Sequence, residues 1–369
     1  MSPLLVSVVL RRPLLLATTS AVTLAVVLSV GACARTDESG EGEPERGGVV
    51  PAVDAGAEAD VDAGDAEVPP CDSSSLCAVS IPLEYGYVTS IVGRSATDVW
   101  ASGTGGVLMH WDGAKWTASS LEKPDTISSL FLTQGETWGV AGDLVVRASL
   151  EPKSIDTTRL ENGQTLRSIS VLPNGNAYVG LGSTAKVLAR LDFDTKALTY
   201  LAAPVLPWAG PAEPLSMRAG FLVPGEALWL VGDHGAVARY PVATLDDADA
   251  GTPGALLPTT SRAALLAAWG SGKQLWAAGT QGTIVHFDGA AWHTEETGTQ
   301  VTLNAIFGLS PTDIWAAGDD GTALHFDGEK WAPVDVGSYR GSFRAIWAAT
   351  SDDVWVGGEE VMFHLGANR

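Results

Sequence analysis

The stretch LNAIFGLSPTDIWAAGDDGTALHFDGEKW, residues 303–331, decides the fold of this chain. Four short runs of β-type residues lie in or directly after it, at residues 305–307, 314–317, 322–326 and 330–334. The turn sequences between them, Asp-Asp-Gly and Asp-Gly, are typical of β-hairpins because glycine adopts positive φ without steric cost. The stretch therefore predicts an antiparallel unit of four strands.

The same pattern recurs along the chain. Seven copies align on an aromatic residue of the second run, at Trp100, Trp138, Tyr178, Trp229, Trp276, Trp315 and Trp355. Successive copies are 38, 40, 51, 47, 39 and 40 residues apart. Such a period is typical of propellers and solenoids, and no copy contains a long helical pattern, which argues against helical and leucine-rich repeats. The sequence predicts an all-β, seven-bladed β-propeller of four-stranded blades.

The two ends of the repeat region are complementary. The last copy stops after its third run, at residues 361–365, and an additional β-type run, residues 78–83, precedes the first copy. We expect this N-terminal strand to complete the last blade, because a closed ring leaves no sheet edge exposed. The predicted propeller spans residues 71–369.

Residues 1–32 are typical of a targeting segment and are excluded from the fold. Arg11 and Arg12 precede an uncharged apolar run, residues 14–30. This run is shorter than the ~20 residues of a membrane-spanning helix.

The apolar run ends in Val30-Gly31-Ala32-Cys33, which resembles the lipobox of bacterial lipoproteins. In that family the cysteine is acylated and becomes the mature N-terminus. The resemblance implies that Cys33 is lipidated, and that Ala34 directs the protein to the outer membrane. A plain secretory signal with an incidental cysteine is the alternative.

Residues 33–70 form a predicted disordered linker that begins at Cys33. Residues 34–70 contain 11 acidic and 2 basic residues, a net charge of −9, and no aromatic residue. Such a segment buries too little apolar surface to fold, and its like charges keep it extended. The whole chain has a net charge of −21, which repels nucleic acid and anionic lipid. We therefore expect membrane attachment through the N-terminal lipid alone.

Cys71 and Cys77 are the only other cysteines. An even pair that follows a secretion signal predicts a disulfide, which would hold the closing strand in place. A metal-binding pair is the alternative, although no histidine lies nearby in the sequence.

The clearest repeat residues are Asp98-Val99-Trp100, His110-Trp111-Asp112-Gly113 and Trp116. The third and fourth runs recur as His286-Phe287-Asp288-Gly289 with Trp292, and as His325-Phe326-Asp327-Gly328 with Trp331. This pattern resembles a repeat of secreted or lipid-anchored propellers in myxobacteria and other large-genome Gram-negative bacteria, whose function is unassigned. The resemblance covers residues 79–365, and it implies a fold and a cell-envelope location but no activity.

One possible hydrogen-bond donor of basic type recurs in every copy. These donors are His110, His286, His325 and His364, with Arg147, Arg190 and Arg239 in the other three copies. The expected partners lie two residues before the aromatic residue: Asp98, Glu136, Asn176, Gln274, Asp313 and Asp353. The fourth copy departs from this pattern, with Ala227 at that position and Glu226 beside it. Positions spread around a ring cannot converge on one metal or substrate, so we interpret them as one structural hydrogen bond per blade. We predict no metal site.

Twelve of the thirteen tryptophans occupy repeat positions, and Trp208 does not. It lies in a proline-rich insertion, residues 201–215, and a second insertion, residues 244–260, follows the fourth copy. Loops commonly carry function, so Trp208 is the candidate contact for a protein or glycan partner. Packing of Trp208 on its own blade is the alternative.

The sequence contains no phosphate loop, no His-Glu-x-x-His and no Gly-x-Ser-x-Gly. We predict no catalytic residue and no cofactor. We interpret the chain as a monomeric, lipid-anchored, extracytoplasmic propeller that acts as a binding scaffold in the cell envelope. A hydrolase or lyase acting on glycans is the alternative, and it requires convergent carboxylates or a metal at the channel mouth.

Overall fold

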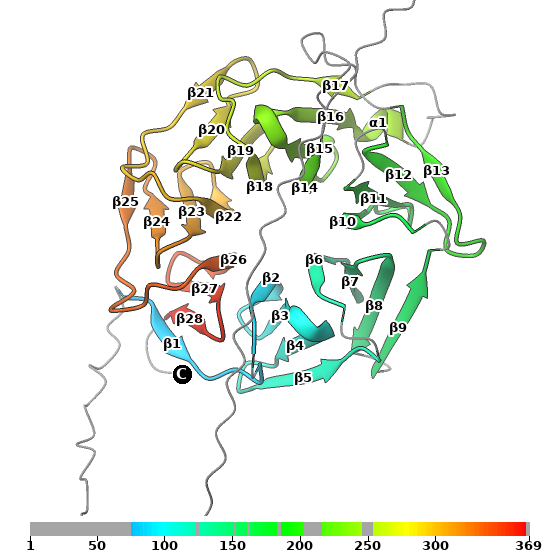
Figure 1. Cartoon of the computed structure of the whole chain (residues 1–369), viewed down its shortest axis with the longest axis horizontal. Helices are drawn as coiled ribbons and strands as arrows, with labels where there is room; N and C mark the ends of the chain where they lie inside the picture. The colour runs from blue at the N-terminus through cyan, green and yellow to red at the C-terminus, as the bar shows by residue number, and fades with distance from the viewer. Residues whose placement is uncertain are drawn as a thin grey trace, which may run out of the picture. The chain divides into compact units, whose positions relative to one another are not determined.

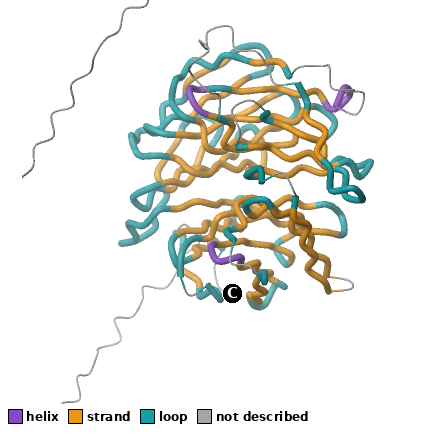
Figure 2. Tube along the Cα trace, turned by 45° about the vertical axis from the view of Figure 1, so that its right-hand side comes forward, coloured by secondary structure: helices purple, strands orange, loops and turns teal. Residues whose placement is uncertain are grey.

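The computed structural model describes residues 75–83, 85–122, 125–150, 153–160, 163–182, 186–202, 216–245 and 254–366. They form seven four-stranded antiparallel sheets arranged as blades around a central axis (Figure 1). Figure 2 shows the strands stacked blade on blade, with the loops at their ends. The predicted seven-bladed propeller is confirmed.

Each blade contributes one strand to each of four positions, counted outward from the axis. First strands are β2 (Val88–Ser95), β6 (Ile127–Leu132), β10 (Leu166–Val171), β14 (Met217–Val223), β18 (Leu265–Ser271), β22 (Leu303–Ser310) and β26 (Phe343–Thr350). Second strands are β3 (Asp98–Gly103), β7 (Glu136–Ala141), β11 (Ala177–Leu181), β15 (Ala227–Gly232), β19 (Gln274–Gly279), β23 (Asp313–Gly318) and β27 (Asp353–Gly358). Third strands are β4 (Val107–Trp111), β8 (Leu144–Leu150), β12 (Leu188–Leu191), β16 (Val237–Pro241), β20 (Ile284–Phe287), β24 (Ala323–Phe326) and β28 (Met362–Leu365). Fourth strands are β5 (Trp116–Ser120), β9 (Lys153–Arg159), β13 (Leu198–Tyr200), β17 (Ala255–Leu256), β21 (Trp292–Thr294), β25 (Trp331–Pro333) and β1 (Cys77–Val79).

The ring is closed by strand β1, as expected. It pairs antiparallel with β28, Cys77 opposite His364 and Val79 opposite Met362, so the last blade has the order β1-β28-β27-β26. The strand is shorter than the predicted run 78–83. Pro82 has no N–H to contribute to a ladder. The predicted disulfide stays a prediction, because Cys71 lies outside the described residues.

The fourth blade differs from the prediction for residues 244–260. This segment contains the end of helix α1 (Val242–Leu245) and also strand β17, which pairs with Ala238 and Arg239 of β16. The blade's fourth strand therefore lies inside the predicted insertion. It has only two residues, too few to show an alternating pattern. No helix in the described ranges is long and apolar enough to cross a membrane.

The blades pack through aromatic side chains on facing sheets. Trp347 of β26 covers Gly93 of β2, and Trp269 of β18 covers Gly308 of β22. A Cβ atom at residue 308 would lie 2.7 Å from the Trp269 ring, closer than atoms can approach. Glycine at these two positions therefore lets an indole fill the space between neighbouring blades.

The Asp-Gly hairpins join third to fourth strands, as the repeat predicts. In blade 6, Asp327 Oδ1 accepts hydrogen bonds from the backbone N–H groups of Glu329 and Lys330, each at 2.9 Å. These bonds lower the pKa of Asp327. Gly328 has φ of 96°, the left-handed region that glycine favours.

We predict that Gly93→Ala destabilises the ring by about 1–3 kcal/mol, because its methyl group would overlap the buried Trp347 ring. Urea unfolding of the variant measures this change. Gly135→Ala is the matched control, since nothing lies within 4 Å of its Cβ position. Equal stability of the two variants would contradict the proposed inter-blade packing.

Candidate functional site

The recurrent hydrogen bond inside each blade is present in most copies. The Nε2 atom of His110 lies 3.0 Å from Asp98 Oδ1, that of His325 lies 2.9 Å from Asp313 Oδ1, and that of His364 lies 2.8 Å from Asp353 Oδ1. Ion pairs join Arg147 to Glu136 and, at 3.9 Å, Arg239 to Glu226. The hydrogen bonds that Arg147 donates to the Glu136 carboxylate raise the pKa of Arg147. The three histidine pairs and the Arg147 pair agree with the prediction, and in the fourth copy, which departs from the pattern, Arg239 forms an ion pair with Glu226.

The remaining two copies are the fifth, where the observed partner differs from the predicted one, and the third, where the predicted pair is not tested. His286 does not pair with Gln274: its Nδ1 lies 3.5 Å from Glu295 Oε1. Glu295 follows β21, and as a carboxylate it competes well with a neutral amide for the imidazole. The predicted pairing of Arg190 with Asn176 stays a prediction.

Each imidazole also packs on the aromatic residue opposite it in the ladder. Ring centroids are 4.2 Å apart for Trp315 and His325, and 3.9 Å apart for Trp355 and His364. In blade 6, Asp313 Oδ1 additionally accepts a 3.1 Å hydrogen bond from Trp315 Nε1. One carboxylate thus positions both rings of the stack, which supports a structural role.

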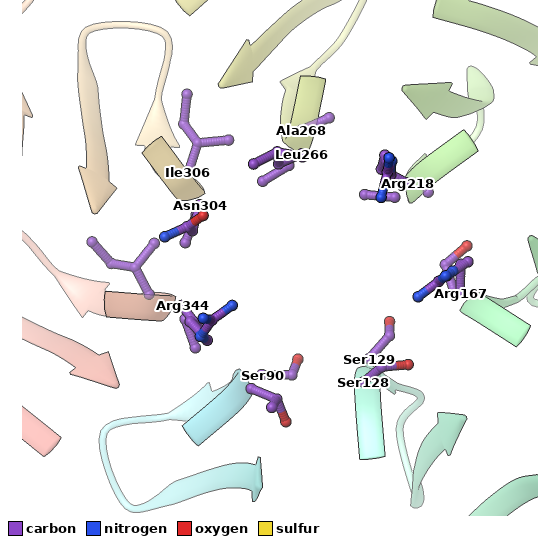
Figure 3. A pocket seen from close by; sticks show the side chains of 18 of the residues that line it. Ser90, Ser128, Ser129, Arg167, Arg218, Leu266, Ala268, Asn304, Ile306 and Arg344 are labelled. Carbon is purple, nitrogen blue, oxygen red and sulfur yellow. The ribbon is translucent and has the colours of Figure 1, made fainter. Parts of the chain in front are cut away.

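A cavity of about 190 Å³ lies on the axis of the ring, and its lining residues all come from first strands (Figure 3). Seven of them occupy the second position of their strand, one per blade: Thr89, Ser128, Arg167, Arg218, Leu266, Asn304 and Arg344. We call these residues the axial ring. It contains three arginines in a chain of net charge −21.

A β-bulge aims each axial-ring side chain. The ladder between first and second strands skips one residue in every blade, for example between Leu166 and Ser168 in blade 3 and between Leu303 and Ala305 in blade 6. The skipped residues are the seven of the axial ring. A bulge leaves one residue outside the pairing and turns its side chain in a new direction, here toward the axis.

The three axial-ring arginines are in different electrostatic states. Arg218 forms a bidentate ion pair with Asp233, at 2.8 Å and 3.1 Å, which raises the pKa of its guanidinium. The guanidinium of Arg344 lies 4.2 Å from the centre of the Tyr87 ring, a cation–π contact. In the described part of the chain, Arg167 has no ion pair or hydrogen bond through its side chain.

A second tier of lining residues follows the axial ring along each first strand. This tier divides into two halves: hydroxyl side chains at Ser90, Ser129 and Ser168 in blades 1 to 3, and methyl side chains at Ala219, Ala267, Ala305 and Ala345 in blades 4 to 7. Ile306 and Ile346 extend the apolar half. The cavity is therefore cationic at the axial ring, with one polar and one apolar wall.

The residues that line the cavity include no aspartate, glutamate, histidine or cysteine. No group of three or more such residues in the described ranges is placed to hold a metal ion. Trp208 lies outside the described residues, so its predicted role as a partner contact is untested.

The axial ring was not predicted from the sequence, although its residues follow a recurring pattern. In every copy the first strand begins with an apolar residue, then the axial residue, then serine or alanine. Placing the strand start at Ala305 excluded the axial position from the repeat. Aligning one position earlier reveals arginine in three of seven copies, at a site where the others have small or neutral residues.

Comparisons with known proteins identify the fold. No family model matches the chain, and no curated protein matches it. Among solved structures, one described as YCF48 bound to D1 peptide is similar, with a TM-score of 0.62, 18% identity, and coverage of 81% of this chain and 99% of that one. Virginiamycin B lyase from Staphylococcus aureus is similar with a TM-score of 0.58, 14% identity, and coverage of 79% and 98%. A binding protein and a lyase thus share this architecture, which leaves function to be argued from the cavity.

We predict that His325→Ala lowers the free energy of unfolding by about 1–3 kcal/mol, because it leaves Asp313 without its imidazole partner. Thermal or urea unfolding measures the effect. The control is His293→Ala, whose side chain is 53% exposed and pairs with Asp288 at 2.9 Å, and whose loss should change stability by less than about 0.5 kcal/mol. Unchanged stability of His325→Ala together with loss of a ligand would overturn the structural role.

Proposed function

We propose that this chain is a binding scaffold of the cell envelope, and that its binding site is the axial-ring cavity, which accepts an anionic segment of a partner. The observation that carries the proposal is the convergence of three arginines on one cavity in a strongly acidic chain. The rest of the molecule repels an acidic partner, so the cavity is the place where attraction exceeds repulsion. Such a field favours one docking position and one orientation.

The chemistry of the lining supports binding over the hydrolase alternative. Guanidinium groups stay protonated at all physiological pH values and only donate hydrogen bonds, so they hold and orient an anion but do not abstract a proton. Ser90 and Ser129 add hydroxyl groups to the lining, whereas Thr89, Ser128 and Asn304 donate their hydrogen bonds within the protein. The convergent carboxylates that the hydrolase would need are not among the residues that line this cavity.

A peptide is the partner class we favour. A solved structure of this fold is described as bound to a peptide, which is compatible with a polypeptide partner. The axial cavity is too small for a folded domain, since about 190 Å³ exceeds only modestly the ~150 Å³ of a cavity that holds one benzene molecule. A partner therefore inserts an extended segment rather than a folded surface.

The location in the envelope is part of the proposal. It rests on the lipobox-like sequence that ends at Cys33 and on the acidic linker to residue 70. Acyl chains on Cys33 would hold the chain at a membrane.

We predict that a dye-labelled peptide of alternating glutamate and alanine, added to the full chain, binds more tightly than its glutamine or lysine counterparts. Fluorescence anisotropy measures the affinity, which should weaken as salt rises because the Debye length falls from ~10 Å at 0.1 M to ~3 Å at 1 M.

Arg167→Gln should weaken binding of the glutamate-containing peptide roughly ten- to hundredfold, because it removes the unpaired cation. Asp233→Asn should strengthen binding roughly fivefold, because it frees Arg218.

The control for these variants is Arg262→Gln. Arg262 is exposed and lies three residues before β18, outside the cavity lining. If Arg262→Gln weakened binding as much as Arg167→Gln, the attraction would come from general surface charge and the cavity would not be the site.

We predict that Cys33→Ala moves the protein from the membrane fraction to the soluble fraction of producing cells and abolishes labelling by an alkyne-tagged fatty acid. The reason is the loss of the only acylation site that the lipobox-like sequence offers. Cys77→Ala is the control and should keep both the label and the membrane association. Label that survives Cys33→Ala would refute the lipoprotein assignment.

A further inference from the structure

The three arginines of the axial ring do not offer equal attraction to an anion. Asp233 already neutralises Arg218 through two hydrogen bonds, and Arg344 is held over Tyr87. Arg167 is exposed, and none of its hydrogen-bonding capacity is satisfied within the described residues. An entering anion therefore meets Arg167 as its first partner.

A glycine directly after the neighbouring strand leaves room for the Arg167 side chain. Gly182 leaves the space beside the side chain open: a Cβ atom there would lie 2.9 Å from Arg167 Nε. Ser128 and Ser129, on the neighbouring blade, lie on the same side of the cavity as Arg167 (Figure 3). The Ser128 hydroxyl donates to the Val140 carbonyl within its blade, so the Arg167 guanidinium is the main donor that an entering oxyanion meets here. A guanidinium suits a planar oxyanion because it donates two parallel hydrogen bonds.

The apolar half of the cavity lies beyond the arginine pair of blades 3 and 4. Leu266 replaces the polar axial residue in blade 5, and Figure 3 shows it with Ala268 across the opening from Ser90. The methyl groups of Ala267, Ala268 and Ala305 form the wall below it. This wall can offer dispersion contacts and shelter from water to a short aliphatic group.

We infer that the cavity binds a carboxylate attached to a short aliphatic group, of about the size of one amino-acid residue. Arg167 holds the carboxylate, the hydroxyl half of the second tier faces the polar atoms next to it, and the Leu266 wall faces the aliphatic group. The carboxy-terminal residue of a polypeptide, such as valine, and a free branched-chain acid share this chemistry. The inference rests on the proposed function, because it assigns a chemical class to the anion of the same cavity.

The face around the cavity provides contacts for the residues that would precede a chain end. Tyr85 is the exposed large hydrophobic residue of the described chain, at 78% exposure. Its backbone carbonyl accepts a hydrogen bond from Thr104, and the Tyr87 N–H donates to the same threonine hydroxyl. Tyr85 is thus held beside the Tyr87–Arg344 contact, at the junction of the first and last blades.

The test compares two forms of one uncharged peptide, built from glycine, serine and glutamine and ending in valine, with a free carboxylate or a carboxamide. Isovalerate and acetate serve as competitors, and calorimetry on the full chain measures each affinity. We expect the carboxamide to bind at least tenfold more weakly than the acid, because it lacks the charge that Arg167 holds. Isovalerate should bind more tightly than acetate, by up to roughly fourfold for each methylene that becomes fully buried.

Two variants separate the polar and apolar contributions. Arg167→Gln should remove the preference for the acid, and Arg167→Lys should restore part of it, because lysine keeps the charge without the planar fork. Leu266→Asn should remove the preference for isovalerate over acetate while the carboxylate still binds. Circular dichroism of each variant confirms that the ring is folded.

The outcomes distinguish this inference from the proposed function. Tight binding of the peptide acid supports the inference with a chain end as the source, and binding of isovalerate alone supports it with a free acid as the source. If glutamate-containing peptides bind with an amidated end while the uncharged peptide acid and isovalerate do not, the inference is overturned and the proposed function stands. If no anion binds, both are overturned.

Discussion

The ladder between β1 and β28 is the interaction on which the rest of this structure depends. It joins Cys77–Val79 to the third strand of the last blade and converts seven consecutive sheets into a ring. Without this ladder the outer edge of β28 would be unpaired, and no hydrogen bonds would tie the N-terminal end of the folded region to the last blade. Every convergent feature of the molecule, including the axial ring, follows from this closure.

Within the closed ring, the β-bulge near the start of each first strand separates structural from functional positions. The residue before the bulge packs into the sheets, as Leu303 does in blade 6, and the residue after it, Ala305, is largely buried beside the cavity that it lines. The bulged residue between them, Asn304, lines the cavity and also donates hydrogen bonds to Asp319 and to the Phe343 carbonyl of the next blade. The fold therefore brings seven bulged positions, one per blade, around one cavity. Arginine, serine, threonine, asparagine and leucine all occur there.

Most of the architecture could be predicted from the sequence, because its signals are local and repeated. Trp315, the Asp-Gly hairpin at Asp327 and the short last copy each report a contact within one blade or a strand missing from it. Strand β17 could not be predicted, since two residues carry no period. His286 was paired wrongly because its carboxylate partner, Glu295, lies beyond the repeat position where the other blades keep theirs.

The candidate site was missed for a different physical reason. The constellation that stood out in the sequence, one histidine or arginine per copy beside a tryptophan, is distributed through the blades and stabilises them. The residues that do converge are far apart in the sequence and become neighbours only through closure. Arg167 and Arg344 share no motif with one another apart from their position after an apolar residue. Convergence around an axis is a property of the closed ring, so it cannot be predicted from the sequence of a single copy.

Closure by an N-terminal strand also has a kinetic consequence. The last blade combines the first strand of the folded region with its final three, so its hydrogen bonds join residues separated by nearly the whole propeller. Contacts of such long sequence separation form slowly, because a large loop must close before they contribute. The blades can assemble one after another as the chain is made, but the axial cavity comes into existence only at the last step. A chain interrupted before β28 would contain all seven first strands but would lack the ladder that ties its two ends together.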